Sequence, residues 1–248
     1  MRRSAIAAVL LLAGCGGDAA APEPERGPGP PAAAQERHFS PTRAAAPERP
    51  QGRWLTARVL APVRLRATPG GRRLERLRPR TEFGSPKVLG VLRRRGRWLQ
   101  VLAPERPNHR PAWVPAARVR LGGVDVSVHV DRSDRMLVVR RGRRVLRRLP
   151  VAVGRPGTET PTGRFAVTDR LRTGRPDSPY GCCALALSGH QTKLLAGWPG
   201  GDRLAVHATP QPETVGRAAS LGCMRAKTRD MQALLQIVPL GAPLFVTA

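Results

Sequence analysis

Short runs of alternating hydrophobic and polar residues, interrupted by glycine and proline, fill most of the chain after residue 53. Residues 124–130 (V-D-V-S-V-H-V) alternate without a fault, which places four valines on one face of a strand. Residues 136–140 and 145–153 continue as strands on either side of a turn, as in a β-hairpin. The pattern therefore predicts a mainly β protein.

One segment near the C-terminus has helical spacing instead. Thr228 is a candidate N-cap, and hydrophobic residues then recur on one helical face, namely Met231, Leu234, Leu235 and Val238. Residues 239–243 (P-L-G-A-P) end this helix, and residues 244–246 (L-F-V) form a last strand. The sequence thus predicts one short helix in the C-terminal region.

The first part of the β region, residues 53–121, has its own pattern. It reads V-R-L-R-x-x-P-G-G, then V-L-x-x-x-G-R-W-L-Q-V, then A-W-V-P, and this order resembles a bacterial SH3-like domain. The resemblance implies a small β-barrel that binds cell-wall polymer or only positions a neighbouring catalytic domain. Trp98 and Trp113 fit either a ligand contact or simple core packing, and packing is the more common role.

The N-terminus has the layout of an export signal. A cationic start precedes a short apolar run over residues 5–12, which is too short to span a bilayer permanently. The run ends in L-A-G-C at residues 12–15, which resembles a bacterial lipobox and implies lipidation of Cys15; a plain signal peptide is the alternative. Residues 16–50 are rich in alanine and proline, as in a disordered linker. We expect an exported protein, lipid-anchored to a bacterial cell membrane and facing the cell wall or periplasm.

Charge and composition narrow the classes of partner. The chain has 43 Lys plus Arg against 17 Asp plus Glu, a formal net charge of +26. Its 41% hydrophobic residues are too many for a disordered tail, and its 4% aromatic residues are few for a protein that stacks nucleic-acid bases. With no DNA-docking helix in the pattern, we expect no nucleic-acid partner; anionic lipids and wall polymers fit an exported cation better.

The remaining cysteines form an odd set: Cys182, Cys183 and Cys223. In an oxidising compartment at least one of them is expected to be a free thiol. Adjacent cysteines rarely pair, because the geometry is strained, so Cys223 is either disulfide-bonded to one of the pair or a nucleophile. No C-x-x-C or histidine-rich spacing supports a zinc site, and we expect neither a metal nor a cofactor.

Four ordered motifs in residues 123–248 carry a second resemblance: 160–165 (T-P-T-G-R-F), 207–209 (H-A-T), 220–225 (S-L-G-C-M-R) and 239–246 (P-L-G-A-P-L-F-V). They are similar to the motifs of the L,D-transpeptidase catalytic domain of the YkuD type. The resemblance implies a β-sandwich domain over residues 123–248 and acyl transfer through a cysteine.

The resemblance implies a role for five residues. Cys223 matches the nucleophile and His207 the general base, since acyl transfer from an amide needs a thiol whose proton a nearby imidazole accepts. The backbone carbonyl of Ala208 would orient the histidine ring. Gly222 belongs to the oxyanion-hole loop, and Arg225 would bind a substrate carboxylate or steady that loop.

One position departs from the family pattern. Leu221 stands where a histidine usually precedes Gly-Cys, and leucine forms no hydrogen bond through its side chain. We therefore consider that His190 enters the cleft in place of the missing ring, although a place on a loop without a catalytic role is the more common outcome. Substrate binding is assigned to Arg225, Ser220, His190 and Trp198.

The family resemblance implies a reaction on peptidoglycan stem peptides. The thiol would attack the carbonyl of the third residue of a tetrapeptide stem, expel the terminal D-alanine and pass the acyl group to an amine of a neighbouring stem. Water as acceptor would instead make an L,D-carboxypeptidase, and the loss of the usual histidine leaves room for a non-catalytic wall-binding lipoprotein. Carbapenem-type β-lactams are expected to acylate the same thiol.

Overall fold

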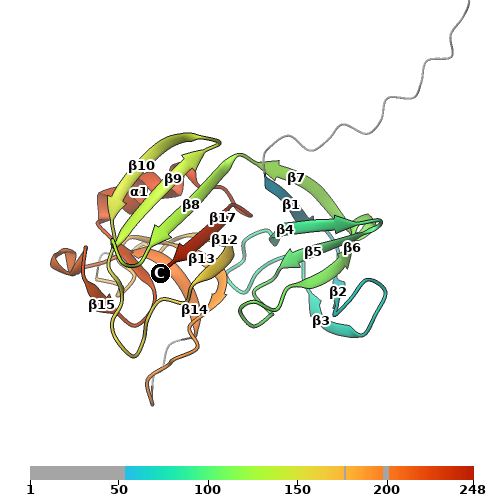
Figure 1. Cartoon of the computed structure of the whole chain (residues 1–248), viewed down its shortest axis with the longest axis horizontal. Helices are drawn as coiled ribbons and strands as arrows, with labels where there is room; N and C mark the ends of the chain where they lie inside the picture. The colour runs from blue at the N-terminus through green and yellow to red at the C-terminus, as the bar shows by residue number, and fades with distance from the viewer. Residues whose placement is uncertain (1–53, 176, 198–200) are drawn as a thin grey trace, which may run out of the picture. The chain divides into compact units, whose positions relative to one another are not determined.

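The computed structural model describes residues 54–175, 177–197 and 201–248 (Figure 1). All of these residues lie in one compact unit, and their strands form two main sheets and a small two-stranded one. The predicted signal peptide with Cys15 and the linker over residues 16–50 lie outside the described residues, as does Trp198.

The first sheet has seven strands in the order β3-β2-β6-β5-β4-β1-β7. Their bounds are β1 Trp54–Val59, β2 Val63–Arg66, β3 Arg73–Leu77, β4 Val88–Arg95, β5 Trp98–Leu102, β6 Ala112–Pro115 and β7 Val119–Val124, with a 3-10 turn η1 at Ala116–Arg118. The sheet encloses its own hydrophobic cluster. Trp113 is buried and stacks against the Arg93 guanidinium, 5.3 Å from the ring centroid, whereas Trp98 is half-buried. The assignment of this region to the SH3-like class stays a prediction.

The second sheet has eight strands in the order β10-β9-β8-β17-β12-β13-β14-β16 (Figure 1). Their bounds are β8 Val126–Asp131, β9 Met136–Arg141, β10 Arg144–Pro150, β12 Gly163–Arg172, β13 Cys183–His190, β14 Arg203–Ala208, β16 Met224–Ala226 and β17 Pro243–Thr247. The two-stranded sheet pairs β11 Val153–Gly154 with β15 Ala218–Ser220, and η2 at Pro212–Thr214 is a 3-10 turn. The fold is mainly β, as the sequence predicts.

The helix α1 spans Thr228–Ile237 and packs on β13 and β14. Met231, Leu234 and Leu235 are buried, so each contributes on the order of 1.5–3 kcal/mol through removal of apolar surface from water. The expected N-cap is displaced by one residue, because Lys227 takes the extended cap conformation and Thr228 is already helical. Among the described residues, no helix has the length and hydropathy that crossing a membrane requires.

Buried and partly buried polar contacts join the first sheet's loops to the second sheet. The side-chain amide of Asn108 donates to the His190 carbonyl at 2.7 Å and accepts the His190 N–H at 2.9 Å. Thr81 donates through its hydroxyl to the fully buried carboxylate of Asp169. The end of β13 is therefore held from the first sheet.

Candidate active site

The parallel pairing of β14 with β16 brings the central side chains together. His207 lies opposite Arg225 in this ladder, and paired residues of neighbouring strands share a face of the sheet. Cys223 immediately precedes β16, so it enters the same region from the end of the strand. These three residues come from two segments that are 16 or more positions apart in the sequence, and strand pairing alone brings them together.

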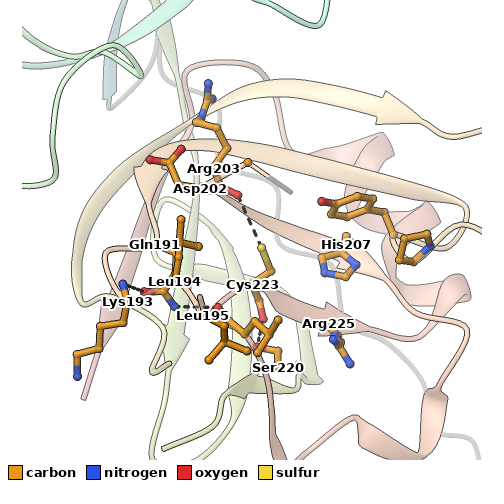
Figure 2. A pocket seen from close by; sticks show the side chains of 14 residues that line it. Gln191, Lys193, Leu194, Leu195, Asp202, Arg203, His207, Ser220, Cys223 and Arg225 are labelled. Atoms are coloured by element: carbon orange, nitrogen blue, oxygen red, sulfur yellow. Dashed lines mark hydrogen bonds between the residues drawn. The ribbon is translucent and has the colours of Figure 1, made fainter. Parts of the chain in front are cut away.

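All three line one cavity of about 110 Å³ (Figure 2). The structure brings together here four residues that the sequence predicts for the site, Cys223, His207, Arg225 and Ser220. The other lining residues are Pro179, Tyr180, Gln191, Lys193, Leu194, Leu195, Gly201, Asp202, Arg203 and Leu221. Leu194 and Leu195 are about half exposed, at 48% and 45%, so the cavity has an apolar rim.

His207 is buried, with 4% of its surface exposed. Its Nδ1 lies 2.6 Å from the Ala208 carbonyl oxygen, so Nδ1 carries the donated proton and Nε2 is left as the unprotonated nitrogen. The ring edge of Tyr180 packs against it with centroids 5.0 Å apart. Burial lowers the pKa of His207 to about 4; the hydrogen bond to Ala208 opposes this change, and the charge of Arg225 adds to it. The imidazole is therefore neutral near pH 7.

Cys223 is a free and partly buried thiol. Its Sγ donates to the backbone carbonyl of Arg203 at 3.8 Å (Figure 2). Burial raises the pKa of Cys223, and a backbone hydrogen bond at Ala205 and the positive charge of Arg225 work against that rise. The resting site thus pairs a protonated thiol with a neutral imidazole.

The loop that carries the thiol is held by side-chain hydroxyls. Ser220 Oγ accepts the Gly222 N–H at 3.0 Å and donates to the Cys223 carbonyl at 2.5 Å. Thr160 Oγ1 donates to the Gly222 carbonyl at 2.8 Å. Gly222 itself has φ +123°, a conformation that side-chain-bearing residues rarely adopt. The Ser220 hydroxyl and the Gly222 N–H, expected at the substrate and the oxyanion, are therefore engaged within the loop.

Arg225 faces the cavity with spare hydrogen-bonding capacity. Its Nη1 lies 3.4 Å from Gln211 Oε1, and its buried Nε has no hydrogen-bond partner within the described part of the chain. Its backbone N–H and carbonyl pair with Ala152 on the neighbouring segment. The guanidinium can thus donate hydrogen bonds to a carboxylate of a ligand.

The ring of His190 does not line the cavity. Its Nε2 lies 2.7 Å from the Pro104 carbonyl and its Nδ1 lies 3.0 Å from Asp202 Oδ1. The ring is held between the first sheet's loop and the start of β14. Of the two positions considered for His190, the structure therefore does not show the one in the cavity, where its ring would replace the histidine missing at Leu221.

Cys223 is a free thiol, which is one of the two alternatives considered for it. Cys182 and Cys183 form a disulfide with each other, and Cys223 is left unpaired. The other alternative, a disulfide between Cys223 and one of this pair, is not found; the Cys223 thiol lies against the Arg203 carbonyl instead. Within the residues described, no group of three His, Cys, Asp or Glu side chains is arranged to hold a metal ion.

Gln191 and Tyr180 are site residues that the sequence analysis did not identify. Gln191 is buried at 6% exposure and contacts the thiol loop, and Tyr180 packs on His207. Tyr180 is the only tyrosine of the chain, which is a weak sequence signal of a functional role. A single glutamine in a loop gives no such signal. Their contacts arise only when β13, β14 and the 220–223 loop are brought together.

Comparison with known proteins gives a family match over the C-terminal part of the chain. The sequence profile of the YkuD family, described as the L,D-transpeptidase catalytic domain, matches residues 125–246. The chain is similar to two proteins named L,D-transpeptidase YkuD. The protein from Bacillus subtilis is 34% identical, and the match covers 46% of this chain and 61% of that relative. The protein from Bacillus licheniformis is 31% identical, and the match covers 48% of this chain and 64% of that relative. The chain thus spans less than two thirds of the length of either relative.

A crystal structure of L,D-transpeptidase 3 from Mycobacterium tuberculosis with a faropenem-derived adduct is also similar, at 19% identity and a TM-score of 0.41. The match covers 56% of this chain and 73% of that one. The model of the L,D-transpeptidase catalytic domain thus matches residues 125–246, just under half of this chain.

Proposed function

We propose that this protein is an L,D-transpeptidase that acts on peptidoglycan stem peptides through a Cys223 acyl-enzyme and forms 3→3 cross-links. One observation carries the proposal: the Cys223 thiol and the neutral His207 imidazole line one cavity, and the Ala208 carbonyl fixes which ring nitrogen can accept a proton.

In the first half of the reaction, Sγ of Cys223 attacks the carbonyl carbon of the third stem residue while His207 Nε2 takes the thiol proton. The resulting oxyanion is assigned to the Cys223 N–H, since the Gly222 N–H is bound to Ser220. The C–N bond then breaks, and His207 gives its proton to the departing D-alanine amine. A thioester on Cys223 remains.

In the second half, the amine of a neighbouring stem attacks the thioester carbonyl. His207 accepts the amine proton and returns it to the sulfur as the C–S bond breaks, which restores the resting thiol. Because the resting thiol and imidazole are both neutral, proton transfer accompanies attack and does not precede it.

Arg225 is assigned to the carboxylate of the terminal D-alanine. Its Nε has no internal partner in the part of the chain that the structure describes, and its charge lies in the cavity beside the thiol. The same charge lowers the pKa of Cys223, so it favours the negative charge that develops on the sulfur as its proton moves to His207.

The segments before the catalytic domain are assigned to anchoring and positioning the enzyme. The lipobox at Cys15 would anchor the protein outside the cell membrane, and the alanine- and proline-rich segment 16–50 would give the catalytic domain reach into the wall. Residues 53–121 are assigned to an SH3-like module beside the enzyme. Carbapenem-type β-lactams would acylate Cys223, because their strained amide presents a carbonyl to the same thiol.

The proposal is tested by incubating the purified protein with tetrapeptide stems and analysing the products by mass spectrometry, with Cys223→Ala as the control. A 3→3 dimer that is absent with the variant is the expected result. A tripeptide alone would replace the proposal by an L,D-carboxypeptidase. Unchanged tetrapeptide, together with no carbapenem adduct on the protein at any pH, would overturn it in favour of a wall-binding protein without activity.

A further inference from the structure

The buried amide of Gln191 lies directly behind the thiol-bearing loop. Its Nε2 donates to the Leu221 carbonyl at 2.8 Å and to the Thr158 carbonyl at 3.0 Å, and it lies 3.3 Å from the Glu159 carbonyl. Its side chain therefore ties two loops together through backbone groups. The Leu221 side chain has no polar group, so it adds no hydrogen bond to this arrangement.

The contact with Leu221 fixes a peptide plane. The carbonyl of residue 221 and the N–H of residue 222 belong to one rigid planar unit and point in opposite directions. Gln191 holds the carbonyl end, and Ser220 Oγ holds the N–H end at 3.0 Å. The plane is thus clamped from both sides.

The next peptide plane carries the donor assigned to the oxyanion. Its carbonyl, on Gly222, accepts from Thr160 Oγ1 at 2.8 Å, so the Cys223 N–H points away from Thr160. Because Gly222 has φ +123° and no side chain to restrict it, the clamped plane before it and the Thr160 hydrogen bond together set the orientation of this N–H.

Gln191 and Gly222 also fit each other in space. A Cβ on residue 222 would lie 2.1 Å from Gln191 Nε2, closer than any side chain allows. The amide therefore fills the volume that a side chain at position 222 would need. This close fit restricts the loop to a single position against Gln191.

The other end of Gln191 is joined to the cavity wall. Its Oε1 accepts the Lys193 N–H at 3.0 Å, and its own backbone N–H donates to the Asp202 carbonyl at 2.6 Å. Lys193 and Asp202 both line the cavity. One buried side chain thus connects the cavity wall with the peptide that precedes the nucleophile.

We propose that Gln191 is a positioning residue for the acyl-transfer reaction. It orients the Leu221–Gly222 peptide and, through it, the Cys223 N–H that stabilises the oxyanion. This inference rests on the proposed function, and it predicts an effect on reactions of Cys223 that form an oxyanion and little effect on those that do not.

Two reactions of the same thiol separate these cases. Acylation by a carbapenem adds Sγ to the β-lactam carbonyl, forms an oxyanion, and then breaks the C–N bond while the nitrogen takes a proton. Alkylation by iodoacetamide forms a C–S bond and releases iodide and a proton without any oxyanion. Gln191→Met keeps the length of the side chain and removes its amide, and Gln232→Met, on an exposed position of α1, is the matched control.

We expect Gln191→Met to slow acylation about 10- to 100-fold, less than the loss of an oxyanion donor itself, while alkylation changes less than about twofold. Gln232→Met should change neither rate. Equal slowing of both reactions, or an unchanged acylation rate in the folded variant, would overturn the inference.

Two further controls keep the result interpretable. If thermal unfolding shows that Gln191→Met does not fold, Gln191→Asn, which keeps the amide but shortens its reach, is measured with the same pair of reagents and the same criteria. If the wild-type protein is not acylated at Cys223, the proposed function fails; if it is acylated and the Gln191 variants match it, only the role of Gln191 fails.

Discussion

The burial of neutral His207 predicts a specific pH dependence of stability. The native protein holds this imidazole unprotonated down to about pH 4, whereas the unfolded chain protonates it below about pH 6.5. Unfolding therefore takes up a proton between these values, and the free energy of unfolding falls as the pH falls. Below about pH 4 both states are protonated and the dependence ends.

The size of the effect follows from the pKa difference. Each pH unit in this window corresponds to about 1.4 kcal/mol for one proton, so the change from 6.5 to about 4 contributes ~3 kcal/mol. His207→Gln removes the titrating group and keeps a hydrogen-bond donor. The difference in unfolding free energy between wild type and variant should shift by ~3 kcal/mol between pH 7 and pH 4, in favour of the variant at low pH.

Urea denaturation at half-unit pH steps measures this difference directly, and titrations shared by both proteins cancel in it. His129→Gln is the matched control: His129 is half-buried against Phe245, and burial lowers its pKa too, so the same sign with a smaller amplitude is expected. A wild-type-minus-His207→Gln difference that stays flat from pH 7 to pH 4 would refute a buried neutral base.

Three further substitutions test other contacts. Arg225→Met removes the charge that lowers the pKa of Cys223, so the pH profile of thiol alkylation should move to higher pH; an unmoved profile would show that the charge does not reach the thiol. Thr160→Val leaves the Gly222 carbonyl without its donor, and urea denaturation should show a loss of about 1–3 kcal/mol. Leu234→Ala, at a fully buried position of α1, should cost about 2–5 kcal/mol, and a smaller loss would mean that the helix packs loosely.

The strands and the helix were predictable where periodicity is local. The alternation over residues 124–130 gives the face on which the valines at 126, 128 and 130 are buried, and the spacing in α1 gives its buried residues. The cap was misplaced by one residue, since Lys227 occupies the N-cap position without any side-chain hydrogen bond that a sequence rule could detect.

The site was predictable only in part. A family motif identified Cys223 and His207, but no pattern in the sequence indicated Gln191, whose contacts join segments about 30 residues apart. The sequence also suggested His190 for the cavity, because histidine chemistry is visible in a sequence, whereas the carbonyl and carboxylate that hold its ring belong to distant segments. Long-range backbone contacts of this kind leave no local signal.

The parallel ladder between β14 and β16 makes the alignment of His207 with Arg225 a property of the main chain. His207 and Arg225 are level because two strands are in register, and sliding one strand by a single residue would turn one of them to the opposite face. The alignment of His207 with Arg225 thus tolerates the exchange of neighbouring side chains. It does not tolerate an insertion or deletion between Arg203 and Ala208, because that would shift the register of the strands.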